Sequence, residues 1–384
     1  MPKRTKVVFD ASPLLVNKTG VAYYIERLIE QAAKRYPDIE FVGFYYNFLG
    51  RRSTKHFPKA PNIRYRAVRF IPSKVVYQLR RWGVSPPLEL LTKERADFAL
   101  FGNFWGYPSL YRTPAAPVIH DLTYLDLPEY VADKNRKDLT RLVPKQIKRS
   151  DFVITVSEFS KQKIADIYKV TADNILVTPI PPSSPAHYPK SECQKELKQL
   201  GITKPFILFL STIEPRKNLT NLIDAYEQLP EKLRTAYQLV VVGRVGWNCE
   251  RELARIEKAK KDGLDVVYAG YVTDQAKAAL YQSAALYTNT SHYEGFGMPV
   301  LEAMSYGVPC AVSDIPVFHE VAGNTARYFK QADPADICKT FVGMLDKNTL
   351  SKLGTQSKQR ATSFRWDTIA ESVVARIKQS VERG

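Results

Sequence analysis

Cysteine is scarce in this sequence, and long apolar runs are missing. The four cysteines stand far apart and form no Cys-x-x-Cys pair: Cys193, Cys249, Cys310 and Cys338. This spacing excludes a disulfide framework and a cysteine metal site, so we interpret them as reduced thiols of a cytoplasmic protein. No segment approaches the roughly 20 apolar residues of a spanning helix, and only a short apolar run precedes Asp10, so no signal peptide is expected. An Asp-x-Asp motif is also absent, so we predict no bound metal ion.

Acidic residues are few relative to basic ones, and the formal net charge is +17. The excess is concentrated in residues 1–189, which hold 30 Lys and Arg against 17 Asp and Glu. Such an asymmetry indicates an acidic partner for the first half of the chain. Nucleic acid and an anionic membrane both fit, although no nucleic-acid-binding module is visible.

The length of 384 residues exceeds a single typical core and favours two domains. Short apolar runs followed by glycine loops recur through both halves, which is typical of α/β domains with parallel sheets. Prolines crowd positions 179–185, so we place the interdomain linker there. The predicted domains are residues 1–185, residues 186–364, and a C-terminal helix over 365–384.

Two positions in the first half are candidates for a site. Gly20 follows a predicted strand over residues 6–10 and opens a helix with apolar positions at 21, 24, 25, 28 and 29. This geometry suits a phosphate, although a helix entry chosen for packing explains it as well. His120-Asp121 ends a short strand over 117–119, where open sheets place functional groups. A lone histidine is also commonly structural.

In the second half, Arg216 and Lys217 follow an unalternated apolar strand over residues 206–210. The two cations are either a solvated pair or a clamp on a diphosphate. Further on, Glu294-Gly-Phe-Gly-Met-Pro-x-x-Glu302 is a glycine loop that opens a helix. Free amides there favour an anion, and carboxylates beside it suit sugar hydroxyls. The alternative is that Glu294 caps the helix and Glu302 is solvated.

These motifs resemble the donor site of the retaining GT-B glycosyltransferases of family 4. Glu294-x7-Glu302, Glu214-Pro-Arg-Lys-Asn218, Val118-Ile-His-Asp-Leu-Thr123 and Thr19-Gly-Val-Ala22 occur in the family's order. The resemblance extends over about 360 residues, with Thr290-Ser291 standing where the family usually has Pro-Ser. It implies two Rossmann-like domains facing across a cleft, with the C-terminal helix crossing back to the first domain.

The resemblance also implies roles for individual residues. Glu302 holds the ribose, Glu294 contacts the transferred sugar, and Phe296, Gly297 and Met298 offer amides to the diphosphate. As implied catalytic groups, Arg216 and Lys217 neutralise the leaving nucleoside diphosphate, and His120 touches the donor sugar. Gly20 approaches the diphosphate from the first domain. Asp121 either orients His120 or positions the acceptor.

The expected activity is a hexosyltransferase without a cofactor that acts by retaining, metal-independent transfer. Motif spacing is most similar to that of bacterial mannosyltransferases, which favours GDP-mannose as donor. A UDP- or dTDP-sugar donor for glucosyl or rhamnosyl transfer is the alternative, as is a non-catalytic nucleotide-sugar binding protein. The expected acceptor is a saccharide, lipid-linked, used in cell-envelope polysaccharide or glycolipid synthesis.

Residues 51–95 are strongly basic, with 12 Lys and Arg against 2 Asp and Glu. Val75, Leu79 and Trp82 follow helical spacing there, with Arg80 and Arg81 beside them. This pattern predicts a basic amphipathic helix at a membrane interface, or an ordinary helix packed on its own domain. Together with the resemblance, it favours peripheral binding to the anionic inner face of the plasma membrane, and no nucleic-acid partner.

Overall fold

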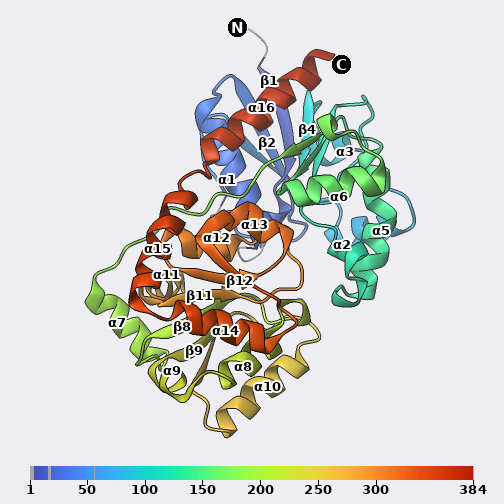
Figure 1. Ribbon diagram of the computed structural model, residues 1–384. Helices are drawn as coiled ribbons and strands as arrows, with labels where there is room; N and C mark the ends of the chain where they lie inside the picture. Colours follow the sequence, from blue (N-terminus) through green and yellow to red (C-terminus); the bar gives the residue numbers. More distant parts are fainter. Residues whose placement is uncertain (1–3, 16–18, 56, 384) are drawn as a thin grey trace. The chain divides into compact units, whose positions relative to one another are not determined.

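The computed structural model describes residues 4–15, 19–55 and 57–383, which form two compact units (Figure 1). The first unit comprises the chain up to Ile180 together with Arg365–Gly384, and the second comprises Pro181–Phe364. The chain therefore enters the second unit within the proline-rich stretch and returns to the first unit at its C-terminal helix.

The first unit is built on a seven-stranded parallel sheet with the order β3-β2-β1-β4-β5-β6-β7. Its strands are β1 (Thr5–Asp10), β2 (Ile39–Tyr46), β3 (Ile63–Val68), β4 (Phe98–Phe101), β5 (Ala115–Ile119), β6 (Val153–Thr155) and β7 (Ile175–Val177). Because β4 and β5 are buried at every position, the apolar runs carry no polar alternation.

Helices connect these strands in the first unit. They are α1 (Gly20–Arg35), α2 (Ser73–Arg81), α3 (Leu88–Thr92), α4 (Thr123–Asp126), α5 (Asp133–Ile147), α6 (Glu158–Tyr168) and α16 (Trp366–Arg383), with 3-10 turns at Ser12–Leu15, Pro128–Tyr130 and Ala172–Asn174. The C-terminal helix α16 packs against α1 and β4, and it buries an apolar face that includes Ile369, Val373 and Ile377.

The second unit has a six-stranded parallel sheet with the order β10-β9-β8-β11-β12-β13. Its strands are β8 (Phe206–Leu210), β9 (Gln238–Val242), β10 (Val266–Gly270), β11 (Leu286–Asn289), β12 (Cys310–Ser313) and β13 (Ala326–Phe329). The last of these was not anticipated, because Ala-Arg-Tyr-Phe is short and its second residue is exposed.

The helices of the second unit complete an α/β fold of the Rossmann type. They are α7 (Lys190–Gln199), α8 (Leu219–Glu227), α9 (Glu231–Ala236), α10 (Glu250–Lys261), α11 (Asp274–Ser283), α12 (Met298–Ser305), α13 (Pro316–Ala322), α14 (Pro334–Met344) and α15 (Lys347–Ala361), with 3-10 turns at Pro215–Lys217 and Gly323–Thr325. Within the described residues, none of these helices or those of the first unit has the length and apolar character needed to span a membrane.

Each sheet has a point where the strand order reverses. In the first unit this point lies between β1 and β4, and in the second it lies between β8 and β11. Ligands of open parallel sheets bind beside the carboxyl ends of the strands at such reversals. The loops that follow these four strands are therefore where a site is expected.

The basic helix α2 differs from its sequence interpretation at one residue. Val75 and Trp82 are 44% and 78% exposed, as an apolar face toward a membrane requires. Arg80, however, is only 5% exposed and donates a hydrogen bond to the carbonyl of Gly106 at 3.2 Å. Its charge therefore does not belong to the outer surface of α2, because the helix turns Val76 and Arg80 inward on the same side.

Candidate active site

Two loops at the strand reversal of the second unit are bound directly to each other. One follows β8 and carries Arg216 and Lys217, and the other follows β11 and carries Glu294. The amide of His292 donates to the carbonyl of Arg216 at 2.9 Å, and the Thr290 hydroxyl donates to the carbonyl of Lys217 at 2.9 Å. The predicted Arg216-Lys217 and Glu294 motifs thus form one structure.

Glu294 lies at the centre of this structure and pairs with both cations. Lys217 Nζ donates to its Oε1 at 2.5 Å, and Arg216 Nη1 donates to its Oε2 at 3.1 Å. The Ser291 hydroxyl lies 2.7 Å from Oε1. Arg216 also binds the carboxylate of Glu214 at 2.6 Å and the carbonyl of Tyr293 at 2.5 Å. Two cations therefore face two carboxylates, and the cluster carries no net charge.

Burial strengthens the electrostatic interactions within this cluster. Glu294 and Lys217 are each only 8% exposed. Burial raises the pKa of Glu294, but the charges of Lys217 and Arg216 outweigh it and hold the pKa at about 2. Burial and the nearby Arg216 lower the pKa of Lys217, and the Glu294 carboxylate only partly offsets them. The carboxylate is therefore ionised at neutral pH and fixes the position of both cations.

The N-terminus of α12 begins immediately after this cluster. Gly297 caps the helix with a φ of +93°, a conformation that favours glycine. A Cβ at this position would lie 2.6 Å from the ring of Phe318, so sterics also exclude a side chain. Among the described residues, no backbone or side-chain acceptor is bound to the amides of Phe296, Gly297 and Met298. Amides without a partner at a helix N-terminus, beside Arg216 and Lys217, have the geometry and charge that suit an anion.

Glu302 lies on α12 but binds residues of α11 that the sequence analysis did not select. Lys277 Nζ donates to Oε1 at 3.2 Å, and the Tyr281 hydroxyl donates to Oε2 at 3.0 Å. Burial lowers the pKa of Lys277, but the Glu302 carboxylate, together with Asp274 and Tyr306, raises it above its usual value. The periodicity of α11 gives no sign of these partners.

The first unit brings Gly20 and His120 to one edge of its sheet. Gly20 opens α1, whose N-cap Thr19 accepts the amide of Ala22 at 3.2 Å. One turn along α1, the ring of Tyr24 meets the ring of His120 edge-on, with centroids 5.7 Å apart. A Cβ added to Gly102, which follows β4, would lie only 3.0 Å from the side chain of Ile25 on the same helix. The strand-reversal loops of this unit therefore pack around α1.

His120 is held in one protonation state. Burial lowers its pKa, so the imidazole is neutral at pH 7. Its Nε2 lies 3.0 Å from the carbonyl of Gly102, which only accepts, so Nε2 carries the proton. The Nδ1 atom, for which no described residue supplies a partner, is then an acceptor for a hydroxyl. Asp121 accepts the amide of Thr123 at 3.0 Å rather than binding the imidazole.

The predicted site residues thus form two groups. Seven lie together in the second unit at the ends of β8 and β11: Arg216, Lys217, Glu294, Phe296, Gly297, Met298 and Glu302. Gly20 and His120 lie together in the first unit. Within the described ranges, no three His, Cys, Asp or Glu side chains gather closely enough to hold a metal ion.

Two α/β units, with paired cations and helix amides at a strand reversal, fit the class of nucleotide-dependent transferases. The family described as "Glycosyl transferases group 1" matches residues 193–360, and "Glycosyltransferase Family 4" matches residues 18–181. Between them they account for most of both units. The chain belongs to the family 4 glycosyltransferases and has their GT-B fold.

Individual proteins resemble the chain over nearly its whole length. The O-antigen chain mannosyltransferase B of Escherichia coli is 27% identical over 391 residues, which cover 96% of this chain and 98% of that protein. The sucrose-phosphate synthase of Thermosynechococcus elongatus superposes with a TM-score of 0.75 at 17% identity, covering 99% and 100% of the two chains. Anabaena HepE, solved with UDP and glucose, has a TM-score of 0.71 at 17% identity, covering 98% and 99%.

Proposed function

We propose that this glycosyltransferase moves mannose from GDP-mannose, with retention of configuration, onto a lipid-linked saccharide during polysaccharide synthesis. The observation that carries the proposal is the buried Arg216–Lys217–Glu294 cluster beside the free amides of α12. Cations and helix amides together suit a diphosphate. Similarity to an O-antigen chain mannosyltransferase favours mannose and a polysaccharide acceptor.

Charge in the cluster suggests how donor binding proceeds. Because Glu214 and Glu294 already balance Arg216 and Lys217, a diphosphate enters favourably only if one carboxylate turns away. Glu294 is the carboxylate shared by both cations, and hydroxyls of the transferred sugar are suitable new partners for it. Arg216 and Lys217 then face phosphate oxygens, whose negative charge grows as the anomeric bond breaks.

In this mechanism the protein supplies charge and position rather than a nucleophile. The free Nδ1 of neutral His120 accepts a hydroxyl of the donor sugar, and Glu302 accepts the ribose hydroxyls in place of Tyr281 or Lys277. Transfer on the face of the departing diphosphate needs no covalent intermediate and preserves the configuration. It also needs no metal ion, since side-chain cations and amides neutralise the leaving group.

Exposed aromatic groups on the second unit can accept the nucleotide base. After β9, Arg244 lies over the ring of Tyr271, which follows β10, at 4.0 Å from its centroid. Tyr271 and Trp247 are 67% and 42% exposed. Such surfaces stack any base, so UDP- or dTDP-sugar donors with glucosyl or rhamnosyl transfer are the second candidate, supported by the HepE complex with UDP and glucose.

The acceptor site belongs to the first unit in this proposal, at the cytoplasmic face of an anionic membrane. The exposed Val75 and Trp82 of α2 and the excess of basic residues in this half of the chain support peripheral membrane contact.

A donor panel tests the proposed reaction. The chain is incubated with GDP-mannose, UDP-glucose and dTDP-rhamnose, released nucleotide is identified by mass spectrometry, and the product anomer is assigned by NMR. We expect release of GDP and an α-linked mannoside. Release from another donor alone, an inverted product, or no turnover of any donor contradicts the proposal.

Two matched arginine variants connect the activity to the cluster. Arg216 and Arg255 each bind two carboxylates, but Arg255 pairs with Asp224 and Glu227 of α8. We expect Arg216→Lys to lower kcat about 10- to 100-fold, because a single ammonium cannot bind two oxygens in parallel. Arg255→Lys should leave kcat unchanged. Equal effects of the two substitutions refute a leaving-group role.

A further inference from the structure

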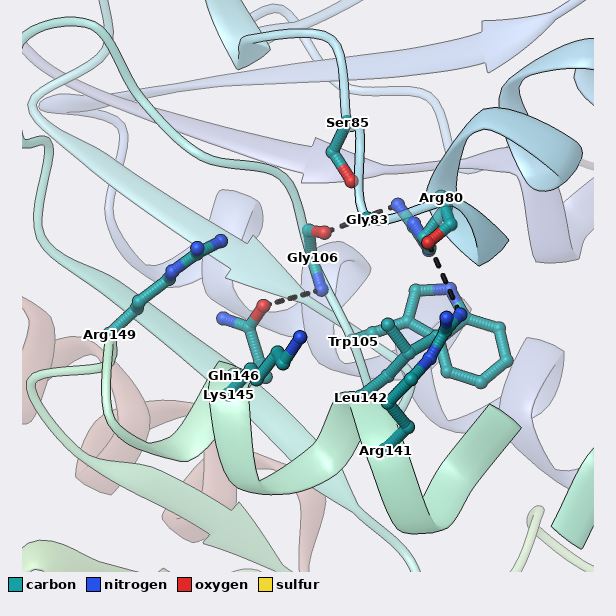
Figure 2. Close-up of a pocket in the computed structure, with 10 residues that line it drawn as sticks. All are labelled: Arg80, Gly83, Ser85, Trp105, Gly106, Arg141, Leu142, Lys145, Gln146 and Arg149. Atoms are coloured by element: carbon teal, nitrogen blue, oxygen red, sulfur yellow. Dashed lines mark hydrogen bonds between the residues drawn. The ribbon is translucent and has the colours of Figure 1, made fainter. Parts of the chain in front are cut away.

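A basic pocket of the first unit is not used by the proposed transfer. It lies between α2, α5 and the loop after β4 and has a volume of about 70 Å³ (Figure 2). A single water needs roughly 10–15 Å³ of such space, so the pocket has room for a group of several heavy atoms. Four of its lining side chains are cationic: Arg80, Arg141, Lys145 and Arg149. Among the described residues no carboxylate lines it.

The positive charge of the pocket is compensated only in part, because Asp10 interacts with Arg80 and Asp138 with Arg141. Neither Lys145 nor Arg149 forms an ion pair with any residue that the structure describes. Arg141 lies 3.9 Å from Asp138, but the same carboxylate is approached by Arg81 at 3.5 Å. The single carboxylate of Asp138 is therefore shared by two guanidinium groups. An anion entering the pocket gains attraction from several cations and meets no carboxylate on the wall.

The floor of the pocket is fixed by hydrogen bonds to the backbone of one residue, Gly106. Gln146 accepts the amide of Gly106 at 2.9 Å, and Arg80 donates to the Gly106 carbonyl at 3.2 Å, as the dashed lines in Figure 2 show. A Cβ at Gly106 would lie 2.0 Å from the ring of Phe101, so only glycine fits. Arg80 is buried against the ring of Tyr107, with its guanidinium carbon 4.5 Å from the centroid. The cation is thus held in place before any ligand arrives.

Apolar side chains are exposed directly beside the pocket. Gly83 and Ser85 line it, while their neighbours Trp82 and Val84 are 78% and 57% exposed. Val75, nearly two turns before Trp82 on α2, is 44% exposed. An anion site next to exposed apolar surface matches a molecule with a charged head and a hydrocarbon tail.

We propose that this pocket binds the phosphate of a phosphomonoester membrane lipid, with the hydrocarbon lying against Trp82 and Val84. A phosphomonoester carries nearly two negative charges at pH 7, which suits several partly compensated cations better than a singly charged phosphodiester. The site goes beyond glycosyl transfer, and it does not depend on which donor or acceptor the enzyme uses.

Vesicle sedimentation with the full chain tests the proposal. The vesicles are phosphatidylcholine mixed with phosphatidic acid or, at matched surface charge, with phosphatidylglycerol. We expect tighter binding to phosphatidic acid. The variant Lys145→Gln/Arg149→Gln should lose about 10- to 30-fold in binding to it, because both cations line the pocket and glutamine replaces their charge-assisted hydrogen bonds to the phosphate with weaker neutral ones. Trp82→Gln should weaken binding to both vesicles and keep the preference for phosphatidic acid.

The control variant is Lys137→Gln/Lys148→Gln, which removes the same charge from exposed positions of α5 and its C-cap outside the pocket. We expect less than about a threefold loss from it. Equal losses in the two double variants, equal binding to the two lipids, or no binding by the unmodified chain overturns the proposal. Displacement from the vesicles by inorganic phosphate assigns the pocket to free phosphate instead. Unchanged thermal unfolding and unchanged glycosyl transfer from soluble substrates verify that the variants are folded and separate this test from that of the proposed reaction.

Discussion

Replacing Glu294 by glutamine tests whether the buried cluster is held together by charge. The substitution keeps the shape and an acceptor oxygen but removes the carboxylate that binds Lys217 and Arg216. Lowering the pKa of Glu294 from 4.5 to about 2 corresponds to about 3 kcal/mol in favour of the ionised form in the folded state. We therefore expect Glu294→Gln to destabilise the second unit by about 3 kcal/mol at pH 7.

The expected loss is large enough to measure directly. The second unit spans Pro181–Phe364, and for domains of this size 1 kcal/mol shifts the Tm by roughly 2–4 °C. Calorimetry should therefore show a Tm lowered by about 6–12 °C. The matched control is Glu302→Gln, whose partner Lys277 is 36% exposed in its side chain. We expect at most about 1 kcal/mol from that substitution, because water screens the pair.

The lowered pKa of Glu294 determines how the stability difference between wild type and Glu294→Gln depends on pH. The pKa of Glu294 is lower in the folded state, so its contribution is complete above about pH 4.5. It is lost as the pH falls from 4.5 toward 2. The difference in stability between the wild-type chain and Glu294→Gln should therefore shrink over this window. A double variant with Lys217→Met should be less destabilised than the sum of the two single changes. A Glu294→Gln chain within about 0.5 kcal/mol of wild type at pH 7 refutes the reasoning.

Three further outcomes are expected. Glu302→Ala should weaken nucleotide affinity about 10-fold with kcat nearly unchanged, because ribose contacts hold equally in the ground and transition states. Calorimetric titration measures the affinity and steady-state kinetics measure kcat. A loss confined to kcat is inconsistent with the assignment of Glu302 to the ribose. Gly297→Ala should lower the Tm of the second unit and abolish nucleotide binding, because the φ of +93° and the ring of Phe318 leave no space for a methyl group. A fully active variant would show that the loop can move. Transfer should survive EDTA, as measured by nucleotide release, and loss of activity that Mg²⁺ restores would show that the cations and amides are insufficient.

Much of the fold could be predicted from apolar runs. The apolar run over residues 206–210 predicts a strand, and the segment behind Ser157 predicts a helix over residues 158–168. Both match the structure at both ends, as β8 and α6, because each is bounded by clear polar or capping residues. Elements with weak boundaries were less accurate. The run over residues 152–157 predicts a strand that ends in a helix N-cap at Ser157. The strand is shorter, Val153–Thr155, but Ser157 caps α6 as predicted by accepting the amide of Ser160.

The members of the candidate site could be selected from the sequence, but their pairing could not. Motif order identified Arg216 and Lys217, and also Glu294, which follows them by 78 and 77 residues along the chain. That Glu294 binds both cations depends on β8 and β11 being neighbours, which is a property of the sheet and not of either motif. Arg80 shows the same limit, since helical spacing places it beside Trp82 but does not reveal its burial.

The return of α16 to the first unit affects how the chain is made on the ribosome. The apolar face of α16 packs against α1, but all of Pro181–Phe364 is synthesised between the two parts of this unit. At 5–20 residues per second, that interval lasts roughly 10–40 s. Throughout it the second unit, being contiguous, can complete its own fold. The surface of α1 that awaits Ile369, Val373 and Ile377 stays open to solvent and to chaperones, so the half of the molecule begun first is finished last.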